Sequence, residues 1–148
     1  MLQDLPEPRD QGVRWVPIAN RHITLQFLGD VDAEEAIERL GDKQFPQVEA
    51  RLGPAIDVLF ERALAIPVAG IETLATQTRN ATKGLVRPDR RPFVGHLTVA
   101  RLGRRARPTR ILGQMFNADF PVHEVSLISS TLTDAGSEYE TLATWHTR

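Results

Sequence analysis

The feature that most constrains this chain is an internal repeat of eight residues. "HITLQFLG" at 22–29 and "HLTVARLG" at 96–103 align without a gap, and both alternate between polar and apolar residues. Such alternation predicts a β-strand, in which residues i and i+2 point to the same face. Each copy therefore presents a histidine beside a threonine, with Ile23, Leu25 and Phe27 of the first copy turned toward the core. The shared residues are His22/His96, Thr24/Thr98, Leu28/Leu102 and Gly29/Gly103.

The rest of the pattern mixes strands and helices. Asp32 and Glu35 form a capping box before a short amphipathic helix that ends at Gly41. Further helices are predicted over 71–83 and 108–116, and each copy of the repeat would then lead into a helix. The chain is expected to form one α+β domain over 1–148, because many strands lie close enough in sequence for antiparallel pairing. Those strands are predicted at 13–16, 22–29, 48–52, 63–68, 96–103, 122–132 and 139–146.

Composition restricts the available chemistry. A chain of 148 residues with 41% hydrophobic content suits one globular domain with its own core. The sequence contains no apolar run long enough to cross a bilayer, and its acidic, proline-containing start differs from a signal peptide, so a cytoplasmic protein is expected. The absence of cysteine excludes disulfides, zinc-thiolate sites and a cysteine nucleophile. Histidine, carboxylate, hydroxyl, lysine or arginine groups must carry any reaction.

The doubled His-x-Thr motif suits chemistry on a phosphodiester. If the two halves pack about a pseudo-twofold axis, His22 and His96 converge on one cleft with Thr24 and Thr98. Imidazole titrates near neutral pH, so one histidine can serve as general base and the other as general acid. Threonine hydroxyls can donate hydrogen bonds to phosphate oxygens. No metal or other cofactor is required.

Other sites have weaker support. A two-histidine metal site is the main rival, but the sequence has no HExxH motif and no carboxylate that recurs beside both copies. A serine triad lacks the GxSxG motif. His123 and His146 have no threonine at i+2 and are expected to be surface or sheet-edge histidines.

Arginines cluster around the second copy. Eight of them lie between Arg87 and Arg110 against one acid, Asp89, although the net charge of the chain is −1. This block is either a solvated basic loop or a surface that raises the local concentration of anions. Arg101 lies at an odd offset from His96, so strict alternation would turn it to the opposite face. A bulge or the strand end would be needed to aim Arg101 at a phosphate; otherwise it is a surface arginine.

Paired HxT motifs preceded by "RWVPIANR" and "RPFVG" resemble the two-histidine phosphoesterase superfamily. Within it, the chain is similar to the bacterial RNA 2′,3′-cyclic phosphodiesterases, also called 2′-5′ RNA ligases, from about Val13 through the closing "VSLISSTLTDAGSEYETLATW". The resemblance implies a bilobal α+β fold with two antiparallel sheets around a central cleft and helices outside. It also implies metal-independent hydrolysis of 2′,3′-cyclic phosphates to 2′-phosphates, with reversible ligation at the same site.

The resemblance further assigns roles to residues. It implies that His22 and His96 are the acid/base pair, with His96 the base, and that Thr24, Thr98 and the closing arginine of HxTxxR, Arg101, bind phosphate. The expected partners are RNA ends or small cyclic nucleotides, with no membrane and a monomeric state. A module of the same fold that binds nucleotides or RNA ends without turnover is the alternative.

The N-terminal segment departs from the family pattern. "MLQDLPEPRDQG" stands where relatives carry a strand and a helix, so the start is expected to be truncated relative to the family. A missing strand would expose a sheet edge and favour self-association.

Overall fold

The computed structural model describes residues 2–9, 11–60, 62–107 and 111–148. Two compact units alternate along the chain. The first comprises residues 1–24, 50–71 and 94–120, and the second comprises 25–49, 72–93 and 121–148. The elements in chain order are η1 (Leu2–Asp4), β1 (Val13–Trp15), η2 (Ile18–Asn20), α1 (Ala33–Leu40), β2 (Glu49–Leu52), β3 (Asp57–Leu59), β4 (Ala63–Ala69), α2 (Glu72–Ala81), β5 (His96–Leu102), β6 (Ala118–Pro121), β7 (Glu124–Thr133) and β8 (Gly136–His146).

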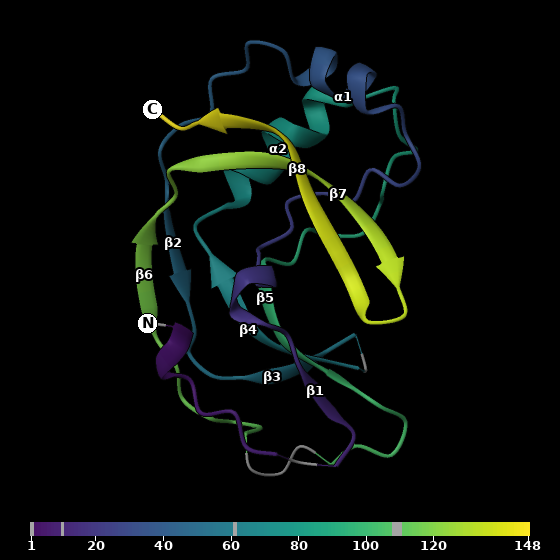
Figure 1. Ribbon diagram of the computed structural model, residues 1–148. Coiled ribbons are helices and arrows are strands. Elements are labelled where there is room, and N and C mark those ends of the chain that lie inside the picture. Colours follow the sequence, from purple (N-terminus) through teal and green to yellow (C-terminus); the bar gives the residue numbers. More distant parts are fainter. Residues whose placement is uncertain (1, 10, 61, 108–110) are drawn as a thin grey trace. The chain divides into compact units, whose positions relative to one another are not determined.

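The first unit is built on an antiparallel sheet. Its strands follow the order β1-β5-β4-β2-β6, and β3 also pairs with β4 (Figure 1). β4 and β5 are central strands, and Leu64, Ile66 and Leu97 on one of their faces are almost fully buried. Burial of these branched side chains removes apolar surface from water and fixes the register of the two strands. The two histidine motifs are held on this sheet.

The second unit combines both α-helices with a two-stranded sheet. β7 and β8 pair in an antiparallel ribbon (Figure 1). Leu40 of α1, Leu74 of α2 and Val125 of β7 are buried in one cluster with Phe45. The predicted cap at Asp32 is confirmed, because the Asp32 carboxylate accepts a hydrogen bond of 2.9 Å from the Glu35 amide. Gly41, with φ of 47°, ends the helix as predicted.

The predicted strand at 22–29 is wrong. Only Ile23 forms a β-bridge, and the segment that follows is irregular. Leu25 instead packs against the cluster of the second unit, Gln26 accepts a hydrogen bond from the buried Thr82 hydroxyl, and Phe27 is 83% exposed. Packing against a helical core competes with sheet pairing, so the alternation of Ile23, Leu25 and Phe27 does not mark one core face.

Three other differences concern element assignment. Residues 111–116 form turns and a bridge between Met115 and Ala55 instead of a helix, while 108–110 lie outside the described residues. The expected strand-to-helix repeat therefore does not hold, because the first copy leads into α1 without forming a strand and no described helix follows β5. The short strands β3 and β6 were not predicted, since three or four residues carry little periodicity.

The α+β class with antiparallel sheets is confirmed. No described helix has the length and apolar character needed to cross a membrane.

Candidate active site

The two HxT motifs meet directly within the first unit. Ile23 and Leu97 form an antiparallel bridge, which sets His22 opposite Thr98 and Thr24 opposite His96. Opposed residues of an antiparallel pair share a face, so two imidazoles and two hydroxyls lie on one surface of the sheet. The motifs were expected to come from two halves packed about an axis. They converge on one face as neighbouring antiparallel segments, with β5 supplying the second motif.

A bulge turns Arg101 onto the same face. β4 pairs Ala65 with Thr98 and Leu64 with Ala100, so Val99 has no partner in the β4–β5 register. Ala63 then pairs with Arg101. Because Ala63 and Ala65 share a face of β4, Thr98 and Arg101 share that face across the bulge. The odd offset from His96 to Arg101 is thereby compensated.

Both histidines are oriented by the same local hydrogen bond. Nδ1 of His22 lies 2.8 Å from the carbonyl oxygen of Asn20, and Nδ1 of His96 lies 2.8 Å from that of Val94. A carbonyl oxygen can only accept, so Nδ1 carries a proton in each ring. In the neutral ring, Nε2 is then the basic nitrogen, as an acid/base histidine on phosphate chemistry requires.

The turn before His22 is anchored by a buried arginine. The Arg21 side chain is 0% exposed and pairs with the Glu7 carboxylate. Its Nε donates to the Val16 carbonyl at 3.0 Å and its Nη1 to the Leu2 carbonyl at 3.4 Å. These contacts tie the N-terminal segment to η2, and thus fix the backbone that leads into His22.

His96 is held by its strand and by an aromatic ring. Gly95 lies so close to β4 that a Cβ atom there would come within 2.2 Å of the Val68 carbonyl oxygen. The Phe60 ring meets the His96 ring edge-on, with centroids 5.2 Å apart and an interplanar angle of 63°. Phe60 is 65% exposed and has φ of 53°, which is unusual for a residue other than glycine.

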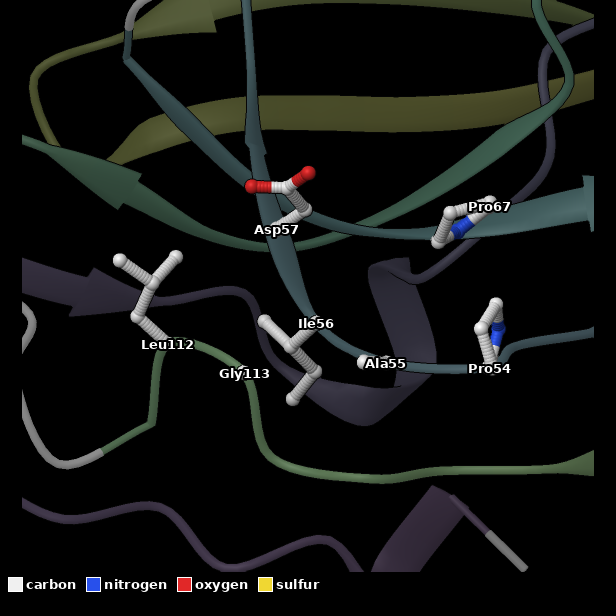
Figure 2. Close-up of a pocket in the computed structure, with 7 residues that line it drawn as sticks. All are labelled: Pro54, Ala55, Ile56, Asp57, Pro67, Leu112 and Gly113. Carbon is white, nitrogen blue, oxygen red and sulfur yellow. The ribbon is translucent and has the colours of Figure 1, made fainter.

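A cavity of about 330 Å³ lies in the same unit (Figure 2). Pro67 in its wall is the register partner of His96, and Asp57 pairs with Ala65, which in turn pairs with Thr98. These pairings put Pro67 and Asp57 on the face that carries the HxT motifs. The remaining lining residues are mostly apolar, namely Pro54, Ala55, Ile56, Leu112 and Gly113.

The basic block does not form one surface within a single unit. Arg87, Arg90 and Arg91 belong to the second unit, Arg101, Arg104, Arg105 and Arg107 belong to the first, and Arg110 lies outside the described residues. Hydrogen bonds from the Arg91 side chain and amide lower the pKa of Asp89 to about 2, and the Arg91 guanidinium has a raised pKa. The Arg79 guanidinium lies 5.8 Å from the centre of the Phe93 ring.

The two remaining histidines lie elsewhere. His123 and His146 are exposed in the second unit, where Glu124 is the register partner of His146. Among the described residues, no group of three or more His, Asp or Glu side chains is arranged to hold a metal ion.

Sequence reasoning missed Arg21 and Phe60. Arg21 directly precedes His22, but nothing in the pattern distinguishes a buried arginine from a surface one. Phe60 follows the unpredicted β3, and its contact with His96 depends on a backbone conformation that sequence periodicity does not report.

The sheet, its bulge and its paired motifs define a LigT-like phosphoesterase. The family model described as "LigT like Phosphoesterase" matches residues 2–54. The crystal structure of TT0787 of Thermus thermophilus aligns over 93% of this chain and 84% of its own, with a TM-score of 0.79 and 25% identity. The structure of E. coli LigT complexed with 3′-AMP covers 98% of this chain and 86% of its own, with a TM-score of 0.74 and 26% identity.

The sequence comparison is more specific. The chain is 34% identical over 145 residues to an RNA 2′,3′-cyclic phosphodiesterase of Aquifex aeolicus. This alignment covers 85% of this chain and 77% of the relative. It is 31% identical to one of Methanothermobacter thermautotrophicus, over 93% of this chain and 84% of the relative. The chain therefore belongs to the RNA 2′,3′-cyclic phosphodiesterase family, and the resemblance read from the HxT motifs is confirmed.

Proposed function

We propose that this protein hydrolyses 2′,3′-cyclic phosphate ends of RNA, or small cyclic nucleotides, to 2′-phosphates without a metal ion. His22 and His96 are the acid/base pair, and Thr24, Thr98 and Arg101 bind the phosphate. The observation that carries the proposal is the bridge between Ile23 and Leu97, because it sets each histidine opposite the threonine of the other motif. The names of the relatives and the bound 3′-AMP of E. coli LigT support a nucleotide substrate.

The reaction needs two proton transfers. One imidazole takes a proton from water at Nε2 while the water oxygen attacks phosphorus. The phosphorus bond to O3′ then breaks, and the other imidazole, protonated at the start, donates its Nε2 proton to O3′. The product carries a 2′-phosphate and a 3′-hydroxyl. By the family resemblance His96 is the base, which leaves His22 as the acid.

The remaining groups stabilise charge. Negative charge grows on the nonbridging oxygens as water attacks, and hydroxyl and guanidinium donors beside them lower the barrier. Thr24 and Thr98 lie opposite the histidines, and the bulge turns Arg101 to their face. A terminal hydroxyl that attacks phosphorus in place of water, with the same cleavage of the bond to O3′, would give ligation at the same groups.

The test is hydrolysis of a 2′,3′-cyclic mononucleotide by purified protein, with the product identified by phosphorus NMR. We expect a 2′-phosphate at the same rate with and without EDTA. His22→Ala and His96→Ala should each lower kcat by about a hundredfold or more. His123→Ala and His146→Ala are matched controls from the exposed histidines of the second unit and should retain activity.

The results also separate the rival function. Binding of the nucleotide without turnover by the wild-type protein would identify a binding module and overturn the hydrolase. Loss of activity in EDTA that is restored by a divalent ion would overturn metal independence. Retained activity in either variant of the HxT histidines would overturn the two-histidine mechanism.

A further inference from the structure

A second arginine lies beside Arg101 and has no role in the mechanism above. In the β1–β5 register, Arg14 is the direct partner of Arg101, between the pairs Val13–Leu102 and Trp15–Ala100. Directly opposed residues of an antiparallel pair share a face. Since the bulge puts Arg101 on the face of the HxT motifs, Arg14 lies on that face as well.

Three cross-strand rows follow one another along β5. His96 faces Thr24, Thr98 faces His22, and Arg101 faces Arg14. β1 and the segment with His22 pair with the same side of β5, so the three rows continue each other. Each of the six side chains in these three rows can bind or protonate a phosphate.

The pairing of two arginines is unfavourable unless an anion joins them. Like charges that are directly opposite across strands destabilise a sheet. Both side chains are exposed, and within the part of the chain that the structure describes neither forms an ion pair with a carboxylate. A phosphate between the two guanidinium groups would convert this repulsion into two charge-assisted contacts.

The repeat indicates why the second arginine comes from β1. In the alignment of the motifs, Arg101 corresponds to Phe27, which is 83% exposed and carries no charge. The first motif thus lacks the arginine that closes the second one. Arg14, which faces β5 from the same side as the first motif, supplies this guanidinium from a different strand, β1.

We propose that Arg14 binds the phosphodiester that precedes the cyclic end, with Arg101 donating to that phosphate as well as to the reacting one, so that the protein prefers the end of an RNA strand to a free mononucleotide. This inference rests on the proposed function. The row of arginines lies three residues along β5 from Thr98, but the bulge at Val99 shortens this to two residues of β4, from Ala65 to Ala63, or about 7 Å at the rise of a strand. That separation suits a neighbouring phosphate, while the histidine and threonine rows, with Arg101, hold the reacting one.

The test compares two substrates in the wild-type protein and in variants of Arg14. Wild-type protein and Arg14→Gln are assayed on a 2′,3′-cyclic mononucleotide and on a short oligoribonucleotide with the same terminal nucleotide. We expect the ratio of kcat/KM for the oligonucleotide to that for the mononucleotide to fall about tenfold in Arg14→Gln. Arg14→Lys should lose less, because it keeps the charge but not the bidentate fork.

A matched control is Arg51→Gln. Arg51 is an exposed strand arginine of the same sheet, but its register partner is Ala69. The substitution Arg51→Gln removes the same charge without breaking an arginine pair. The ratio of kcat/KM for the two substrates should therefore stay at the wild-type value. An equal change in Arg51→Gln would show a general electrostatic effect and overturn the proposal. So would an equal loss on both substrates in Arg14→Gln.

A binding measurement keeps this inference separate from turnover. Affinity for a labelled oligoribonucleotide with a 2′-phosphate end is followed by fluorescence anisotropy against salt. Loss of one phosphate contact should reduce the slope of log affinity against log salt by about one in Arg14→Gln. An unchanged slope would overturn the role of Arg14 even if hydrolysis is observed. Absence of hydrolysis in the wild type would overturn the proposed function alone.

Discussion

The two HxT motifs carry the same side chains but are supported in different ways. The second lies at the start of β5, a central strand between β1 and β4, with Leu97 and Val99 buried. The first motif follows η2 and joins the sheet through one bridge residue, Ile23. Its Thr24 is the last residue of this segment of the first unit. His96 is held by close backbone packing, whereas His22 is held by side-chain contacts of Arg21. The same pair of side chains is therefore supported by different local structure in the two motifs.

This difference predicts that the motifs fail for different reasons. Steric change should break the second motif, where two strands are in close contact. Loss of charge or hydrogen bonds should break the first, where polar contacts hold a turn. The variants below test each expectation, beginning with the largest effect.

Gly95→Ala should have the largest effect. A Cβ atom would lie 2.2 Å from the Val68 carbonyl oxygen, and this oxygen belongs to the backbone of β4 and cannot move aside. We expect a loss of about 3 kcal/mol in the free energy of unfolding, measured by urea denaturation, and loss of activity through displacement of His96.

Gly103→Ala is the control for that variant. Its Cβ atom would meet the Gly12 carbonyl oxygen at 3.4 Å and the Gly12 Cα at 3.8 Å, which are ordinary contacts, and Gly103 lies just after the same strand. Its stability should remain near that of the wild type. If both variants unfold equally easily, close packing before His96 is not what supports the second motif.

Arg21→Gln should have the next largest effect, and it should act on the first motif. The variant removes a buried cation that contacts Glu7 and the carbonyl groups of Leu2 and Val16. Charge-assisted hydrogen bonds contribute about 2 kcal/mol, so both the melting temperature and kcat should fall. In imidazole NMR spectra, the His22 signals should shift while those of His96 stay in place. Shifts of equal size at both histidines would contradict a separate anchor for the first motif.

Phe60→Leu should have a smaller effect, confined to the second motif. The edge-on contact with His96 is worth about 1 kcal/mol beyond burial, so we expect a severalfold fall in kcat with little change in KM. The His96 imidazole signals should shift and those of His22 should not. Phe60→Tyr keeps the ring and should restore the rate; failure to do so would argue against the ring contact as the cause.

Arg91→Gln should have the smallest effect. The folded-state pKa of Asp89 is lowered to about 2 from 3.8, mainly by hydrogen bonds from Arg91. Because this pKa is depressed, the contribution of the pair is complete above pH 3.8 and is lost as the pH falls through about 2. The carboxyl titration of Asp89 by NMR should therefore move upward in Arg91→Gln, while activity at neutral pH is unchanged. An unmoved titration would exclude Arg91 as the cause.

Much of the site could be predicted from the sequence, because its chemistry lies in a repeated local pattern. The repeat identified His22, Thr24, His96 and Thr98, and the structure brings all four to one sheet face. The alternation of side chains along a strand showed that Arg101 needs a bulge to reach the face of His96. It could not show that the bulge exists, since a register shift depends on how β4 and β5 pack. Arg21 and Phe60 could not be found, because their contacts join segments that are not adjacent in the pattern.

By itself, the sequence determined which groups this protein can use: two imidazoles, two hydroxyls and a nearby arginine, at spacings that suit a strand. Only the tertiary structure decided that the two motifs pair with each other, that Val99 is left without a partner, and that Arg14 faces Arg101. The physical reason is that side-chain direction within a strand follows from local backbone geometry. The register between strands is instead set by the packing of residues far apart in the chain.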